Sequence, residues 1–529
     1  MIHKKTLLAT LVGASLCLPM AAAAKDVTGD GKDLTLRVAY DADPVSLDIQ
    51  EQLSGGILQL SHLTFDPLVR WNQDLQFEPR LATGWKQLDD TTLQMNLRKG
   101  VKFHSGNPFT AKDVAWTVER LKRSADFKAI FEPVESVEVV DDYTINLNTK
   151  KPYPLLLNLA TYIFPMDSEF YSGKTENGKD KSAIVKNGNS FASRNVSGTG
   201  PYTVTQRQQG VKVEFERFEG YWDKQSPGNA DHIVLTPISE NATRVAALLS
   251  GDVDFISPVP PNDLERVRAA EGVKLVTMSG TRIIMLQMNQ ERVEAFKDPK
   301  VRKAFVYAVN QQAIAERLMK GFATPAAQLS PKGYVGYNPD LEPRYDLEKA
   351  KQLMKEAGYE DGFSITMMAP NNRYVNDAQI AQAVAAMLAR INVTVDLKTL
   401  PKAQYWSEFD ARAADMMMIG WQSDTQDSAN FFEYLTFCPD ADTGAGQYNA
   451  GMYCNPEVDQ LVRDANLETD RAKRAEMLQA AEKAIYDDAA FIPLHWQDLA
   501  WAADTNVQIE PVLNVMNFPY LGDVVIKPE

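Results

Sequence analysis

Alternating apolar and polar positions predict β-strands in the first half of the chain. Between Val211 and Arg217, valine and phenylalanine alternate with lysine and glutamate, which is typical of a strand with one buried face. The segments Leu34–Tyr40 and Tyr143–Thr149 are also rich in β-branched and other apolar residues, and each predicts a further strand.

The second half of the chain shows a helical period instead. Asp298 and Pro299 supply an N-cap and a first-turn proline, and apolar positions at helical spacing follow them. A second helix is predicted to start at Asp346 and stop at Gly358. A third apolar stripe covers Ile380–Ile391 and leads into the strand-like Val393–Leu397. Helices and strands that alternate in this way predict a layered α/β protein.

The N-terminus carries the pattern of a secretory signal peptide. Lys4 and Lys5 precede the apolar stretch Leu7–Met20, and a run of four alanines ends at Ala24. This stretch is too short for a membrane span. We therefore predict that residues 1–24 are removed near Ala24 and that the mature protein is periplasmic. Cys17 follows a leucine and not a small residue, which disfavours a lipoprotein.

Charge and length narrow the class of protein. The formal net charge is −15, and losing the two lysines of the leader moves it to −17, which disfavours nucleic acid or anionic lipid as a partner. A mature chain of about 505 residues exceeds one hydrophobic core, so two or three lobes are expected. No Pro- or Gly-rich linker divides them. The chain is therefore predicted to leave one lobe, build another, and return through strands that act as hinges.

The two cysteines that remain after export are Cys438 and Cys454. An even number of cysteines in a compartment that permits disulfides favours a bond between them, although two inert thiols are the alternative. Closing this loop should stabilise the fold by roughly 3 kcal/mol in the chain-entropy model.

The sequence offers little to an enzyme. No two of its histidines lie at the spacing of a metal-binding helix, and no nucleophile elbow, P-loop or dinucleotide fingerprint is present. We expect no metal, no cofactor and no catalytic residues. A hydrolase built from dispersed residues stays open as an alternative, because catalytic triads assemble in space.

Motifs in a fixed order resemble the family 5 extracytoplasmic solute-binding proteins, which include the dipeptide- and oligopeptide-binding proteins of ABC importers. The most specific motif is LRKGVKFHSGNPFTAKDV at residues 97–114. The others are Pro44–Asp48, Phe65–Val69, Leu81–Trp85, Gly198–Tyr202, Gly220–Trp222, Thr243–Arg244, Gly251–Asp254 and Asp298–Ala304. Directly after Pro44–Asp48, Ile49 stands where the family usually has proline.

This resemblance implies a periplasmic binding protein fold of the type II-like class, with two lobes that close on a ligand. Lobe I would comprise residues 25–281 and 503–529, with an inserted subdomain at about 68–195, and lobe II residues 282–502. The hinge candidates are Ile283–Met288 and Trp496–Ala503. The family's partners are a small peptide or related solute and a membrane ABC permease, and we expect a monomer.

The resemblance also places a ligand-gripping carboxylate at Asp424, in the polar loop that follows Trp421. Peptide binders hold the ligand's α-ammonium there, because an ammonium moved from water into a closed cleft needs a charged partner. Trp421 would cover this site and Asn430 would complete it, although residues of such a loop also serve simply as turn formers.

Further cleft residues are candidates with an equally ordinary alternative. Arg373 is predicted to reach a ligand carboxylate, or else to be a solvated loop arginine. Ser54 and Gly55 are further candidates, because the glycines Gly55 and Gly56 would let backbone approach the ligand closely. The aromatic candidates for cleft walls, each of which core burial would also explain, are Tyr374, Tyr405, Trp406 and His104.

The expected ligand is a peptide or peptide-like, amine-bearing solute. The dipeptide binders carry an arginine pair where this chain has Ala378 and Gln379, so dipeptide specificity is not implied. Glutathione, an opine, an oligosaccharide, haem or a nickel complex are the alternatives within the family.

Overall fold

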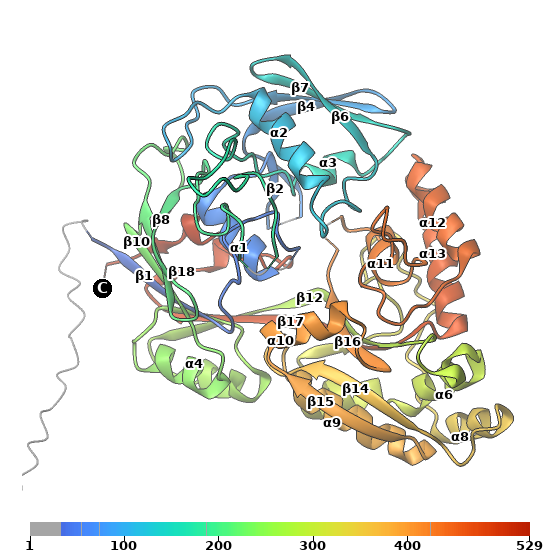
Figure 1. The fold of residues 1–529 in the computed structure, drawn as a ribbon. Coiled ribbons are helices and arrows are strands. Elements are labelled where there is room, and N and C mark those ends of the chain that lie inside the picture. The colour runs from blue at the N-terminus through green and yellow to red at the C-terminus, as the bar shows by residue number, and fades with distance from the viewer. Residues whose placement is uncertain (1–32, 54, 74, 187, 424, 529) are drawn as a thin grey trace, which may run out of the picture.

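Figure 1 shows the fold in a computed structural model, which describes residues 33–528 apart from 54, 74, 187 and 424. The predicted signal peptide and two candidate site residues, Ser54 and Asp424, therefore lie outside the described residues. No helix in the described part is long and apolar enough to cross a membrane.

One large mixed sheet organises the molecule around two long strands, β12 (Val273–Met288) and β17 (Phe491–Asp504), which pair antiparallel. The first half of the sheet adds β11 (Phe255–Ser257), β1 (Thr35–Tyr40), β10 (His232–Pro237), β9 (Lys212–Arg217) and β8 (Tyr202–Gln208), in this order. The second half adds β16 (Met416–Trp421), β14 (Ser364–Pro370) and β15 (Thr394–Leu400), while the short β13 (Ala323–Pro325) pairs with β17.

The predicted hinge segments lie inside these long strands. Ile283–Met288 forms the fully buried end of β12, and Trp496–Ala503 lies within β17. The expected boundaries at 281/282 and 502/503 therefore fall within paired strands and not in loops. Figure 1 shows β12 and β17 running between the strands of the first half of the sheet, such as β1 and β10, and those of the second half, such as β14 and β15.

The helices predicted in the second half are confirmed. α6 (Pro299–Ala308) starts after Asp298, whose side chain accepts a hydrogen bond from the backbone N–H of Lys300. α8 (Leu347–Glu356) is capped in the same way by Asp346. The third apolar stripe forms α9 (Asp377–Leu388) and a short 3₁₀ turn, and it leads into β15 as expected.

A separate four-stranded antiparallel sheet lies at the top of Figure 1. Its order is β4 (Ala82–Asp89), β5 (Thr92–Leu97), β7 (Thr144–Thr149) and β6 (Val134–Asp141). α2 (Ala111–Leu121) packs on it and begins with a reciprocal capping box between Thr110 and Asp113.

The remaining strands and α-helices complete the described structure. They are α1 (Gly55–Thr64), β2 (Val69–Trp71), β3 (Phe77–Pro79), α3 (Leu156–Leu159), α4 (Asn241–Leu249), α5 (Leu264–Arg268), α7 (Gln311–Ala313), α10 (Lys402–Asp410), α11 (Ala429–Leu435), α12 (Pro456–Leu467), α13 (Arg471–Asp488), β18 (Val507–Gln508) and β19 (Val525–Ile526).

Burial explains one difference from the predicted strands. Val213 and Phe215 of β9 point into the core, but Val211 precedes the strand and is 48% exposed. Its backbone N–H closes the turn onto the carbonyl oxygen of Gln208 after Gly210, which has positive φ. The strand predicted from alternating polarity therefore starts one residue too early, because the turn before it also contains a valine.

One buried apolar cluster links the four-stranded sheet to the second half of the chain. It joins Met95 and Phe131, near that sheet, to Trp421, Phe431 and Leu478, which lie around α11 and α13. Packing across this boundary holds the two regions together in the described arrangement.

Candidate ligand-binding cleft

The structure contains two adjoining cavities that the two halves of the large sheet line together. The smaller has a volume of about 900 Å³ counted to its open mouth, and the larger about 1620 Å³. They share the loop after β1, including Asp41 and Asp43, and they share Lys402 from the opposite side. We call the two together the cleft.

Strand topology explains why polar side chains meet here. β1 runs parallel to β10 and β11, so Tyr40, Pro237 and Ser257 stand in register at the carboxyl ends of these strands. All three residues line the cleft. Across it, β14 and β15 are also parallel and end together at Pro370 and Leu400. Ligands of α/β sheets bind at such carboxyl ends, where the loops leave the sheet.

The second half of the sheet contributes cationic side chains to the cleft. Arg373 follows β14, Lys402 follows β15, and Arg282 lies on β12. Within the described residues no side chain hydrogen-bonds to the Lys402 ammonium, and the buried Nε of Arg373 has no hydrogen-bond partner there. Burial and the neighbouring Arg373 lower the pKa of Lys402 to about 8.

Acidic side chains line the facing and hinge walls. Asp43 accepts a hydrogen bond from the backbone N–H of Gly210 at 2.9 Å and lies 3.9 Å from Arg207. Burial nonetheless raises the pKa of Asp43. Asp498, on β17, likewise has a raised pKa because of burial, and the N–H of Gly280 partly offsets this. The cleft is therefore a polar, partly desolvated site with charges of both signs.

Two of the residues predicted from sequence line the cleft. Arg373 lies in the smaller cavity and Trp406 in the larger. The ring of Tyr374 lies 5.0 Å from the Arg373 guanidinium carbon, and the indole N–H of Trp406 is buried without a partner in the described part of the chain.

The other described candidates are held by internal contacts. Tyr405 is fully buried, and its hydroxyl donates to the carbonyl oxygen of Met418 at 2.5 Å. The Tyr374 hydroxyl donates to the carbonyl of Gly420. His104 packs edge-on against Phe218, and burial lowers its pKa. These three residues do not line either cavity, and Gly55 is the first residue of α1.

The loop that contains Asp424 is well supported on both sides. The indole N–H of Trp421 donates to Asn430 Oδ1 at 2.8 Å. Asp427 forms a buried two-point ion pair with Arg474, with both N–O distances at 2.8 Å. The Trp421 hydrogen bond links this residue to Asn430 at the start of α11, and the ligand-binding roles of Trp421, Asn430 and Asp424 stay predictions.

A buried carboxylate joins regions from both sides of the cleft. Asp126, which follows α2, is fully buried and accepts hydrogen bonds from the Tyr448 hydroxyl at 2.8 Å and from Gln447 at 3.3 Å. Lys186 pairs with the same carboxylate at 3.1 Å and reaches Asp410 of α10 at 3.6 Å. We call this set the Asp126 junction.

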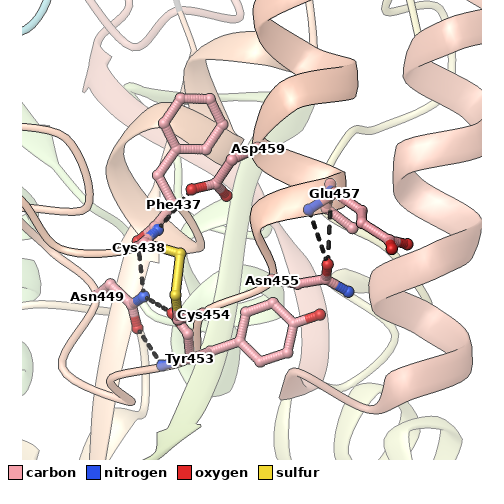
Figure 2. Close-up of a disulfide and its surroundings, with 9 residues drawn as sticks. Phe437, Cys438, Asn449, Tyr453, Cys454, Asn455, Glu457 and Asp459 are labelled. Atoms are coloured by element: carbon pink, nitrogen blue, oxygen red, sulfur yellow. Dashed lines mark hydrogen bonds between the residues drawn. A yellow bond between two sulfur atoms is a disulfide. The ribbon is translucent and has the colours of Figure 1, made fainter.

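Figure 2 shows that Cys438 and Cys454 form a disulfide, which confirms the predicted pairing. Asn449, between them, donates to the carbonyl oxygens of Phe437 and Tyr453. The closed loop contains Gln447 and Tyr448, so the disulfide constrains the segment that contacts Asp126.

Comparison with known proteins decides the family. Residues 76–443, well over half of the chain, match the bacterial extracellular solute-binding proteins of family 5. The chain belongs to this family.

Its relatives match it over almost their whole length. The glutathione-binding protein GsiB of Salmonella paratyphi A is 27% identical over 522 residues, which cover 96% of each chain. The periplasmic binding protein DppA from Helicobacter pylori, solved with the peptide STSA, has a TM-score of 0.82 at 24% identity and covers 93% of this chain and 98% of its own. The dipeptide-binding protein from Pseudoalteromonas sp. SM9913, solved with Met-Leu, has a TM-score of 0.83 at 23% identity, with 93% and 100% covered.

These similarities confirm the expected fold class and the recognition as a family 5 solute-binding protein. The relatives are named as binding proteins and not as enzymes. Among the residues that the structure describes, no group of three or more His, Cys, Asp or Glu side chains is arranged to hold a metal ion.

Sequence reasoning missed several cleft residues, above all Lys402, Arg282 and the pair Asp41 and Asp43. One signal was available for the acids, because they directly follow the predicted strand Leu34–Tyr40 at its carboxyl end. Lys402 lies just after β15 in the same way, with only Pro401 between them. Arg282 gave no such signal, because it lies within a strand and not after one.

Proposed function

We propose that this solute-binding protein captures a peptide or peptide-like, amine-bearing solute in the cleft and delivers it to the permease of an ABC importer. The observation that carries the proposal is the convergence of Arg373 and Lys402, unpaired within the described residues, with acids on a polar cavity between the two halves of the sheet. A peptide carries both an ammonium and a carboxylate, so it complements walls of both signs.

The proposed mechanism is closure about hinge strands. Lobe I, residues 25–281 and 503–529 with a subdomain at about 68–195, and lobe II, residues 282–502, would rotate about β12 and β17. Contacts that a ligand makes to both lobes exist only in the closed form, so ligand binding shifts the population toward that form. The permease would then recognise the closed, loaded shape.

Within the cleft we assign the ligand's carboxylate to Arg373 and its ammonium to Asp424. Arg373 suits this role because its guanidinium is always charged and it lines the smaller cavity. Trp406 would contribute an apolar wall. Removal of residues 1–24 near Ala24 and a monomeric, periplasmic protein complete the proposal.

Native mass spectrometry of the protein purified from its own periplasm tests the solute class. We expect a bound mass of a short peptide or a peptide-like compound such as glutathione, and an intact protein mass that lacks residues 1–24. A bound sugar, haem, opine or nickel complex would replace the peptide proposal with one of the family's other ligands.

Titration calorimetry then tests the orientation of the ligand. A free peptide should bind to the wild-type protein, whereas the same peptide with an amidated C-terminus should bind poorly, and Arg373→Met should bind both forms equally weakly. Peptides recovered after incubation should be intact, since cleavage would favour a hydrolase.

A further inference from the structure

Lys402 stands at the point where the two cavities of the cleft meet. It is the first residue of α10, directly after Pro401, and its backbone N–H donates to Asn372 Oδ1 at 2.7 Å. This bond and the helix start fix its backbone, while the side chain lines both cavities. Arg373, by contrast, lines only the smaller one.

The charges around Lys402 leave its ammonium without a close partner. Arg373 and Arg282 lie on its own side, and Asp41 and Asp43 face it from the loop after β1. The Oδ2 atom of Asp43 is engaged by Gly210 and Arg207, whereas its buried Oδ1 has no hydrogen-bond partner among the described residues. Asp41 and Asp43 act on the Lys402 ammonium only through longer-range attraction, and neither forms an ion pair or hydrogen bond with it. A half-buried ammonium in this position is costly unless an anion joins it.

A ligand whose single C-terminal carboxylate binds Arg373 would leave Lys402 without an anionic partner in the larger cavity. That cavity, of about 1620 Å³, leaves room for a ligand that extends past Arg373. We propose that Lys402 binds a second anionic group of the solute, so that the preferred ligand is a peptide-like molecule with two carboxylates, such as an acidic or γ-glutamyl peptide. This inference rests on the proposed function and specifies its substrate class.

A matched pair of ligands tests the inference. Two tripeptides that differ only in a glutamate or a glutamine are titrated into the wild-type protein by calorimetry. The glutamate peptide should bind at least tenfold more tightly, which corresponds to about 1.4 kcal/mol. Lys402→Met should abolish this preference, so that the glutamate and glutamine peptides bind the variant with similar affinity.

The controls separate charge from structure. Lys402→Arg keeps the charge and should keep the preference. Lys398→Met removes an exposed lysine of β15 and should behave as wild type. If Lys402→Met does not fold, as judged by its thermal transition, Lys402→Gln takes its place with the same expected loss.

Each outcome has a definite meaning. Equal binding of both peptides by the wild-type protein, or a preference that survives in Lys402→Met, overturns the role of Lys402 but leaves peptide binding intact. If the wild-type protein binds neither these peptides nor glutathione, the proposed function itself fails, and the inference fails with it.

Discussion

The proposed recognition of a ligand's amino group depends on the carboxylate of Asp424. Its neighbours Ser423 and Thr425 are buried and hydrogen-bonded to each other. If Asp424 binds a ligand ammonium in the cleft, as proposed, the ion pair would offset the cost of removing both charges from water. The nearby ion pair of Asp427 and Arg474 shows that this loop already stabilises one buried charge.

We predict that Asp424→Asn weakens binding of the native peptide ligand by roughly 30-fold to several thousand-fold, equivalent to ~2 to 5 kcal/mol. The substitution keeps the shape and removes the charge. Calorimetry with the free and the N-acetylated ligand measures the effect, and acetylation should weaken binding to the wild-type protein only. Asp442→Asn, at an exposed site, is the matched control. Affinities within a few-fold of each other would make Asp424 an ordinary loop residue.

Glu482 on α13 provides a second test at the scale of one residue. It is fully buried and accepts hydrogen bonds from the backbone N–H of Leu329 and Ser330 and from the Ser330 hydroxyl. Burial raises its pKa from 4.5 to about 7 despite these donors. The folded protein therefore holds this proton more tightly than the unfolded chain does.

Because the folded pKa is the higher one, the stability that Glu482 contributes is complete below about pH 4.5 and is lost as pH rises to about 7. The expected loss is on the order of 3 kcal/mol. We predict that Glu482→Gln flattens the dependence of the melting temperature on pH in this window. Glu476→Gln, exposed on the same helix, should leave the slope unchanged. An unchanged slope in Glu482→Gln would show that the carboxyl titrates normally.

At the scale of elements, capping signals and periodicity located the helices, because Asp298 and Asp346 act locally on the first turn. The strands were found where their polarity alternates. The full length of β12 could not be predicted, because its first part includes exposed polar residues such as Thr277 and Ser279. Pairing with β17 keeps this part of the strand extended. Local sequence does not encode a partner strand that lies some 200 residues away.

The disulfide loop is the element with the clearest prediction. Linking Cys438 to Cys454 constrains the unfolded chain, and a loop of this length contributes roughly 3 kcal/mol. We predict that reduction, or Cys438→Ser with Cys454→Ser, lowers the melting temperature measured by calorimetry. Equal melting temperatures of the oxidised and reduced protein would show that the disulfide does not contribute to the stability of the fold.

At the scale of the whole molecule, the cleft itself was beyond sequence reasoning. Arg373 was identified because it lies near the position where the dipeptide binders carry an arginine pair, whereas the only local signal for Lys402 was its place just after a strand. Tertiary structure brings it near Asp41, more than 350 residues earlier in the chain. The same holds for Asp126, whose partners Gln447 and Tyr448 are distant in sequence.

The Asp126 junction should favour the closed form of the molecule. Asp126→Asn retains an acceptor for Tyr448 but loses the charge that pairs with Lys186. We predict an affinity for the native solute that is roughly tenfold weaker, because charged hydrogen bonds of this kind contribute about 1.5–3 kcal/mol. Small-angle X-ray scattering should detect a larger radius of gyration at the same solute concentration.

Asp142→Asn, in an exposed turn of the same region, serves as the control for this substitution. Wild-type affinity and wild-type compaction in Asp126→Asn would mean that the junction forms without contributing to closure.

The long pairing of β12 with β17, which two register shifts interrupt, limits how this protein can be dissected. The ladder runs from Val273 opposite Asp504 to Gln287 opposite Phe491, so each half of the sheet takes its inner edge from strands that continue into the other half. A gene fragment cut near residue 281 would expose unpaired strand edges, which promote aggregation. The first and last segments of the described chain lie close together instead, since the backbone N–H of Leu34 donates to Asp231 and the carbonyl oxygen of Ile526 accepts from Asn229. Circular permutation that joins these ends is therefore the rearrangement that the architecture accommodates.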